Sequence, residues 1–263
     1  MKVLGIIPAR YASTRFPGKP LVELGGMSMI QRVYSQAKKC TSLDALVVAT
    51  DDVRIFDHVE SFGGTVIMTS AAHLSGTDRC AEVLIGTQLN AFLETPKSNL
   101  VRSSLPKTPK FYTHVVNIQG DEPFIEPEQI DSLVQFLVEK NYDIASQAFR
   151  FTDLETASNP NIVKVVCAAN NKALYFSRAA IPYPSEKFAE QFFLKHIGLY
   201  AYKAEVLVNL SRLTESYLER AEKLEQLRWL EAGYTIGITE TKFMSLSVDA
   251  PSDVEQILKT LKK

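Results

Sequence analysis

Short, almost uninterrupted apolar runs alternate with amphipathic segments from the N-terminus to about residue 140, and this alternation constrains the fold more than any other feature. The apolar runs are Val3 to Ile7, Ala45 to Ala49, Thr65 to Met68 and Val115 to Ile118. Such runs are typical of strands that are buried on both faces of a parallel sheet. Apolar residues recur at helical spacing over 30–37, 55–62 and 81–85. The pattern therefore predicts right-handed βαβ crossovers and a doubly wound α/β sheet.

After about residue 140 the pattern changes to longer alternating stretches, which suit antiparallel strands on the same core. These stretches lie at 162–166, 173–176 and 192–202. An amphipathic helix is predicted from Ser216 to Ala232, with Ser216 as its N-cap and Gly233 past its end. A last helix is expected to begin near Pro251. Residues 95–110 hold three Pro, four basic residues and no acid, which predicts an inserted surface loop.

Charge and cysteine content exclude several classes of protein. The 29 Lys and Arg are balanced by 30 Asp and Glu, so a net charge of −1 gives no bulk field to gather nucleic acid or an anionic membrane. Three Cys without paired spacing fit a reducing compartment and argue against a zinc or disulfide framework. No stretch approaches the roughly 18 apolar residues of a membrane span, and the N-terminal apolar run is too short for a signal peptide. We expect a cytoplasmic protein with neither nucleic acid nor membrane as a partner.

The loop after the first strand is a candidate anion site, because ligands of such sheets bind beyond the carboxyl ends of the strands. It reads ARYASTRFPGKPL and carries Arg10, Arg15 and Lys19 with no acid before Glu23. Residues that can bring hydroxyls and backbone N–H groups close to an anion are Ser13, Thr14 and Gly18. The loop indicates either binding of a nucleoside triphosphate with Mg²⁺ or a solvated basic loop.

Two carboxylates are candidate metal ligands. The loop after the fourth strand reads NIQGDEP, and a buried strand that delivers Asp121 to its C-terminal edge is a common way to present a carboxylate to Mg²⁺. Asp249 follows a short apolar run at 246–248 and is the best second ligand. The alternative role of Asp249 is an N-cap for the helix that begins near Pro251.

Polar residues in the second half also form patterns. In the predicted strand KHIGLYAY, period two places His196, Gly198 and Tyr200 on one face. His196 is then either a structural histidine or part of a ligand wall. On the predicted helix 216–232, a polar stripe either faces solvent or lines a cleft. The members of this stripe are Glu222, Glu225 and Gln226.

Taken together, these segments resemble the 3-deoxy-manno-octulosonate cytidylyltransferases, also called CMP-Kdo synthetases. The matching segments, in order, are PARYASTRFPGKPL, ATDD, MTSAAHLSGTDR, NIQGDEP, NPNIVKVV, ALYFSRAAIPY, KHIGLYAY, LEQLR and SVDAPSD. The resemblance runs from about residue 3 to residue 255. It implies a fold like that of the nucleotide-diphospho-sugar transferases, a doubly wound, mostly parallel sheet with an antiparallel substrate-binding extension.

The resemblance further implies an enzyme that transfers the cytidylyl group of CTP to the anomeric hydroxyl of 3-deoxy-D-manno-octulosonate (Kdo). The products would be pyrophosphate and CMP-Kdo for lipopolysaccharide biosynthesis, with Mg²⁺ as cofactor and a homodimer as the assembly. One domain over 1–263 would hold a nucleotide-binding part (1–140), a sugar-binding and dimerisation part (141–245) and a C-terminal metal-ligand strand and helix (246–263). Alternatives are a cytidylyltransferase for 8-amino-Kdo or sialic acid and a non-catalytic nucleotide-binding module.

Roles for individual residues follow from the same resemblance. The residues implied in catalysis are Arg10, Lys19, Asp121 and Asp249, and the metal ligands would be Asp121 and Asp249. The residues implied in nucleotide binding are Ala9, Arg10, Ser13, Thr14, Arg15, Lys19, Ser75, Gly76 and Thr77. The residues implied in sugar binding are Arg79, Gln119, His196, Tyr200, Glu225 and Gln226.

Overall fold

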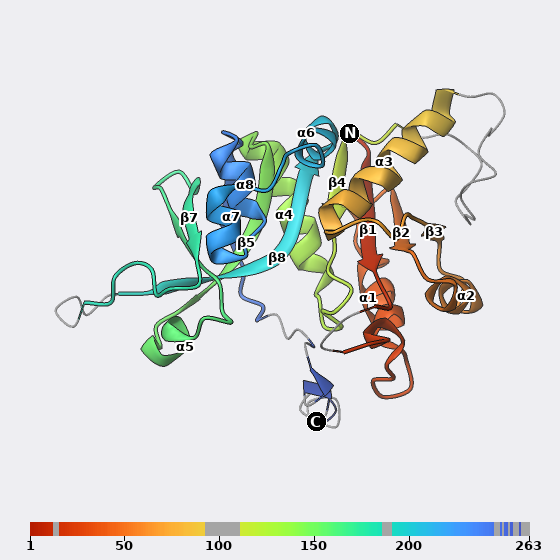
Figure 1. Cartoon of the computed structure of the whole chain (residues 1–263), viewed down its shortest axis with the longest axis horizontal. Coiled ribbons are helices and arrows are strands. Elements are labelled where there is room, and N and C mark those ends of the chain that lie inside the picture. The colour runs from red at the N-terminus through yellow and green to blue at the C-terminus, as the bar shows by residue number, and fades with distance from the viewer. Residues whose placement is uncertain are drawn as a thin grey trace. The chain divides into compact units, whose positions relative to one another are not determined.

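The computed structural model of the chain contains two compact units (Figure 1). The first comprises Met1–Asp131 and Ser245–Lys263, and the second comprises Ser132–Met244. The residues that the structure describes are 1–12, 16–92, 111–185, 191–244, 248, 250, 251, 253, 254 and 258. Of the predicted site residues, Ser13, Thr14, Arg15 and Asp249 lie outside the described residues, as do residues 95–110, where a loop was predicted, and residues 246 and 247.

The first unit is built on a parallel sheet with the strand order β3-β2-β1-β4. Its strands are β1 (Val3–Ala9), β2 (Ala45–Thr50), β3 (Val66–Met68) and β4 (His114–Asn117). Its helices are η1 (Lys19–Leu21), α1 (Met29–Ala37), α2 (Val53–Ser61) and α3 (Gly76–Phe92). The chain moves from β1 outward to β3 and then returns to the other side of β1, so the strand order switches between β1 and β4. Such a switch point is where α/β sheets bind ligands.

Strand β1 continues through Pro8 to Ala9, two residues past the predicted end of the apolar run. The Ile6 carbonyl accepts a hydrogen bond from the backbone N–H of Ile118 at 2.8 Å. Because backbone polar groups alternate in direction along a strand, Pro8 turns the same way as Ile6. Pairing with β4 has already ended at Asn117. Pro8 has no N–H to donate toward β4, whereas pairing with β2 continues through Pro8 and Ala9 and carries Ala9 to the edge of the sheet.

The second unit contains the predicted antiparallel strands together with one parallel pair. Its strands are β5 (Ile144–Phe151), β6 (Lys164–Cys167), β7 (Ala173–Ser177), β8 (Phe193–Lys203) and β9 (Ile236–Glu240). Strand β5 pairs antiparallel with β8 and parallel with β9, and β6 pairs antiparallel with both β7 and β8. The mixed, mostly parallel α/β fold with an antiparallel extension is thus confirmed, whereas β5 and β9 themselves were not predicted.

The predicted continuous helix from Ser216 to Ala232 is wrong. The chain forms α7 (Tyr217–Glu222) and α8 (Gln226–Glu231), separated at Lys223, whose φ of 57° lies in the left-handed region. The Glu222 carboxylate accepts hydrogen bonds from the Ser177 hydroxyl at 2.6 Å and from the backbone N–H of Arg178 at 2.9 Å. These tertiary contacts lie at the point where the helix ends. The remaining helices are α4 (Pro127–Lys140), α5 (Leu154–Ser158) and α6 (Ala204–Leu210).

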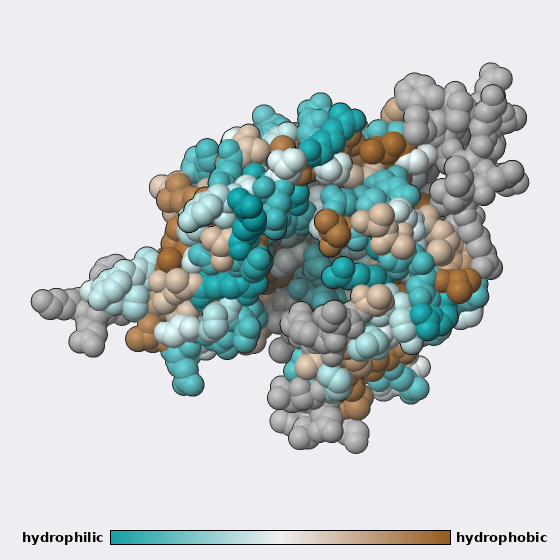
Figure 2. All heavy atoms as spheres, viewed as in Figure 1, coloured by the Kyte–Doolittle hydropathy of each residue, from teal (hydrophilic) through white to brown (hydrophobic). Residues whose placement is uncertain are grey.

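Helix length and side-chain hydropathy were predicted to be unlike those of a membrane-spanning chain. Within the described part of the chain, no helix is both long enough and apolar enough to cross a membrane. On the face shown in Figure 2, hydrophilic side chains predominate and apolar side chains appear in small separate groups. At the C-terminal end, Pro251, Asp253 and Val254 are helical, in agreement with the predicted start of the last helix.

Candidate active site

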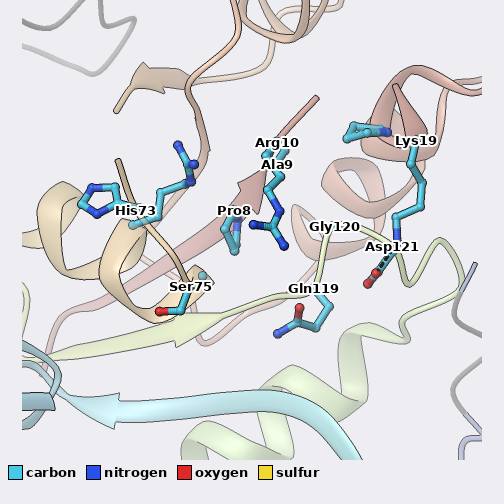
Figure 3. A pocket seen from close by; sticks show the side chains of 12 residues that line it. Pro8, Ala9, Arg10, Lys19, His73, Ser75, Gln119, Gly120 and Asp121 are labelled. Carbon is cyan, nitrogen blue, oxygen red and sulfur yellow. Dashed lines mark hydrogen bonds and ion pairs between the residues drawn. The ribbon is translucent and has the colours of Figure 1, made fainter. Parts of the chain in front are cut away.

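A pocket lies in the first unit at the carboxyl ends of β1 and β4, where the strand order switches (Figure 3). The residues that line it are Pro8, Ala9, Arg10, Lys19, Pro20, His73, Ser75, Gly76, Arg79, Gln119, Gly120 and Asp121. Two glycines keep its walls close together. A Cβ atom on Gly120 would lie 3.0 Å from the Pro8 carbonyl oxygen, and one on Gly76 would lie 3.3 Å from the Pro8 ring. Larger residues at these positions would push the loops away from β1.

The loop after β1 is braced by an aromatic ring. Gly18 adopts a φ of +72°, and its N–H donates to the Tyr11 carbonyl at 3.0 Å. A Cβ atom on Gly18 would lie 3.1 Å from the Tyr11 ring, whose centroid is 3.3 Å from the Arg54 guanidinium carbon. The ring therefore ties Arg10, which precedes it, to the turn that leads into Lys19. Sequence reasoning assigned no role to Tyr11, although its place between two candidate phosphate ligands was a usable signal.

The N-terminus of helix α3 borders the same pocket. The Ser75 hydroxyl accepts a hydrogen bond from the N–H of Asp78 at 3.1 Å, and the Asp78 carboxylate accepts one from the N–H of Ser75 at 3.3 Å. This reciprocal capping fixes the helix start, with Ser75 and Gly76 in the pocket wall and Thr77 buried. A helix N-terminus carries partial positive charge and favours a bound anion.

Lys19 and Asp121 form an ion pair at one side of the pocket, with 2.6 Å between Nζ and Oδ2 (Figure 3). The exposed fractions of the two side chains are 16% and 29%. Lys19 Nζ also donates to the Val248 carbonyl at 2.9 Å, and the Val248 N–H donates to the Asp121 carbonyl at 3.0 Å. Val248 is fully buried in an apolar cluster with Leu24 and Met29. The residue that precedes Asp249 in the sequence is thereby held beside Asp121.

Arg79 lines the pocket but is already engaged. Its guanidinium is 2.8 Å from Asp51 Oδ2 and also donates to the Thr69 hydroxyl, and only 3% of the residue is exposed. Nearby, His73 contacts the Glu82 carboxylate. Asp51 and His73 were not singled out as candidates. Both follow a predicted strand, so their position at the carboxyl edge of the sheet was the signal that could have found them.

The donor set near Asp121 fits a divalent cation that is shared with a ligand. Among the described residues, no group of three or more His, Cys, Asp or Glu side chains is placed to hold a metal ion. Mg²⁺ is usually bound through one or two carboxylates together with substrate phosphates, and it retains several waters. One carboxylate beside cationic side chains therefore suits a metal that arrives with a triphosphate.

In the second unit, His196 and Tyr200 lie together as predicted, with ring centroids 5.4 Å apart. His196 Nε2 is 2.9 Å from the Ser146 hydroxyl, and burial lowers the pKa of His196 to about 3. Burial raises the pKa of Tyr200 well above its usual value, and the Glu225 carboxylate adds to this. Both rings are therefore uncharged near neutral pH. The strict alternation breaks at a register shift, because Ser146 pairs with Tyr200 whereas the next residue, Gln147, pairs with Ile197.

The predicted stripe of Glu222, Glu225 and Gln226 does not exist, because Lys223 interrupts the helix. Glu225 lies 3.0 Å from the Arg228 guanidinium, and Gln226 is buried at the start of α8. Glu222 is bound to Ser177 and the Arg178 backbone instead.

Comparison with known proteins gives consistent matches. The sequence model of a family described as cytidylyltransferase matches residues 4–238. The chain is 48% identical to a 3-deoxy-manno-octulosonate cytidylyltransferase of Parabacteroides distasonis, over 98% of this chain and 97% of that one. It is 44% identical to a protein of the same name from Fusobacterium nucleatum, over 100% and 98% of the two chains.

Solved structures agree. A CMP:2-keto-3-deoxy-manno-octonic acid synthetase complexed with CTP is similar with a TM-score of 0.86 and 38% identity, over 100% of this chain and 99% of that one. A cytidylyltransferase from Leptospira borgpetersenii, at 15% identity and a TM-score of 0.63 over 100% and 87% of the two chains, shares the fold. Since the matches extend over nearly the full length of the sequence, the chain belongs to the cytidylyltransferase family and, within it, to the 3-deoxy-manno-octulosonate cytidylyltransferases.

Proposed function

We propose that the pocket between β1 and β4 binds CTP with a divalent cation and is the place where the cytidylyl group is transferred. The acceptor is the anomeric hydroxyl of Kdo, and the products are CMP-Kdo and pyrophosphate. The observation that carries the proposal is the meeting of Lys19 and Asp121 at the switch point of the sheet, 2.6 Å apart. A cation suited to phosphate and a carboxylate suited to a metal share one pocket of a chain that belongs to this family, and this supports the proposal.

Positioning and charge neutralisation are the main tasks of the protein in such a reaction, because phosphoryl transfer needs little covalent participation. Arg10 and Lys19 line the pocket and are proposed to hold the triphosphate. The N-terminus of α3, which enters the pocket wall at Gly76, adds partial positive charge. Together they would stabilise the charge that develops on the departing pyrophosphate.

Asp121 is proposed to bind Mg²⁺, with Asp249 as the second carboxylate. Mg²⁺, when bound, supplies a Lewis acid that polarises the phosphoryl group and lowers the pKa of an attacking hydroxyl. The hydrogen bond between the Val248 N–H and the Asp121 carbonyl supports the pairing of the two carboxylates, because it holds Val248, which precedes Asp249 in the sequence, at the loop after β4.

Six residues are proposed to contact the sugar acid, on the resemblance to the family: Arg79, Gln119, His196, Tyr200, Glu225 and Gln226. Because burial lowers the pKa of His196 to about 3, His196 would meet a sugar hydroxyl as a neutral hydrogen-bonding group and not as a counter-ion for the carboxylate. A homodimer, a cytoplasmic location and a place in lipopolysaccharide synthesis belong to the same proposal and rest on the resemblance to the family.

The test is a pyrophosphate-release assay with four nucleoside triphosphates and a panel of ulosonic acids, each with and without Mg²⁺. We expect release only when CTP, Kdo and the metal are all present. Release with CTP and 8-amino-Kdo or sialic acid, but not with Kdo, would reassign the acceptor. Absence of release with every acceptor by a folded protein would refute the proposed reaction.

A further inference from the structure

The ammonium group of Lys19 already forms an ion pair with Asp121, the carboxylate that is proposed to bind the metal. We infer that Lys19 and the divalent cation are alternative partners of Asp121, so that the cation binds well only after a triphosphate has drawn Lys19 away. This inference rests on the proposed function, because it takes Asp121 as a metal ligand. It makes Lys19 a gate on metal binding in addition to its contact with the nucleotide.

The geometry makes the two partners compete. Lys19 Nζ lies 2.6 Å from Asp121 Oδ2 and 2.9 Å from the Val248 carbonyl oxygen. Mg²⁺ binds carboxylate oxygens at about 2.0–2.1 Å, so a cation on either oxygen of Asp121 would lie within a few ångströms of the ammonium. The Lys19 and Asp121 side chains are largely shielded from solvent. Repulsion between like charges is less screened there than in water, and metal binding therefore requires Lys19 to move.

A triphosphate gives Lys19 another anionic partner in the same pocket. Lys19 and Arg10 both line this pocket, and a nucleoside triphosphate carries roughly four negative charges. When Lys19 turns to the phosphates, the Asp121 carboxylate becomes available, while the hydrogen bond from the Val248 N–H to the Asp121 carbonyl still holds the loop. Nucleotide and metal are then positively coupled, and each raises the affinity for the other by the same factor.

The test measures Mn²⁺ binding without nucleotide, by the electron paramagnetic resonance signal of free Mn²⁺. In Lys19→Met the side chain keeps a similar length but loses its charge. We expect Mn²⁺ to bind about tenfold more tightly to this variant than to the wild-type protein, equivalent to about 1.4 kcal/mol. Arg10→Met is the matched control, because among the described residues Arg10 lines the same pocket without an ion pair to Asp121. It should leave Mn²⁺ affinity within about twofold of the wild type.

The outcomes test the exchange of partners at Asp121 and the proposed metal assignment separately. Equal Mn²⁺ affinity in wild type and Lys19→Met, or an equal gain in Arg10→Met, would overturn the exchange and leave the proposed reaction intact. In Lys19→Met combined with Asp121→Asn, the gain should vanish. A gain that persists there would place the metal elsewhere and so contradict the metal assignment itself. Far-UV circular dichroism checks folding, and Lys19→Gln serves as the second variant if Lys19→Met does not fold.

Discussion

Partly buried His196 should make the second unit sensitive to mild acid. Burial lowers the pKa of His196 from 6.5 to about 3. Because the folded value is the lower one, the unfolded state binds more protons between pH 6.5 and about 3, and the free energy of unfolding falls as the pH is lowered through this window. Each pKa unit corresponds to about 1.36 kcal/mol. Lowering the pH from 7 to 5 should therefore cost about 2 kcal/mol through this one group.

The assay compares urea unfolding of the wild type and of His196→Gln at pH 7 and pH 5. Gln does not titrate and its amide can still hydrogen-bond to Ser146, which lies 2.9 Å from His196 Nε2. Trp229 is the single tryptophan of the chain and lies 5.1 Å from the Tyr200 ring, so its fluorescence reports on this unit. The wild type should lose about 2 kcal/mol more than the variant between the two pH values, and any pH-independent cost of the substitution cancels.

Equal losses in the two proteins would refute this reasoning. A nuclear magnetic resonance titration gives a direct check, because the ring signals of His196 should show no inflection between pH 7.5 and pH 5. An inflection near 6.5 would mean that the ring is solvated. It would also remove the argument that His196 meets the sugar as a neutral group.

Three further predictions concern the first unit. Asp121→Asn should lower kcat by about 100-fold or more while the far-UV circular dichroism spectrum is unchanged, because one charge is lost isosterically; near-normal turnover at saturating Mg²⁺ would exclude Asp121 as a metal ligand. Gly18→Ala should lower the free energy of unfolding by about 1–2 kcal/mol, because it places a Cβ at a φ of +72° and 3.1 Å from the Tyr11 ring. It should also lower kcat/KM. Urea unfolding and initial rates measure the two effects, and no change in either would show that the turn relaxes freely. Burial raises the pKa of Cys40 to about 12, so iodoacetamide at pH 8 should modify it at least about 100-fold more slowly than a free thiol; rapid labelling, followed by mass spectrometry, would show that the thiol is accessible.

Sequence patterns predicted the parallel half of the fold because strands buried on both faces are apolar throughout. Strand β5 escaped prediction because its sequence, IASQAFRF, contains Ser146 and Gln147, which are fully buried yet polar. Ser146 lies within 3.0 Å of the carbonyl oxygens of Ile197 and Leu199. Its partners are about 50 residues away in the chain, and no local pattern reveals that its hydroxyl is satisfied. The break at Lys223 also depends on distant residues, because Ser177 and Arg178, at the end of β7, hydrogen-bond to Glu222.

The candidate site was also predictable only in part. Because ligands bind at the carboxyl ends of parallel strands, the sequence alone predicted that Arg10, Lys19 and Asp121 lie in one pocket. The contacts of Val248 with Lys19 and Asp121 span more than a hundred residues, and spacing alone left Asp249 open between a metal ligand and a helix cap. Asp249 itself lies outside the described residues, and its role as a metal ligand stays a prediction.

The cations of the pocket look equivalent in the sequence, but their surroundings assign them different tasks. Arg79 is buried and its charge is neutralised by Asp51. It therefore forms part of the pocket wall but attracts an incoming anion only weakly. Lys19 is tied to Asp121 and must exchange partners. Within the described residues, Arg10 is exposed and has no ion pair, so it is the cation that a triphosphate can reach without breaking an existing contact. Loss of Arg10 should therefore lower the rate at which the nucleotide associates, whereas loss of Lys19 should change the affinity of the pocket for the metal.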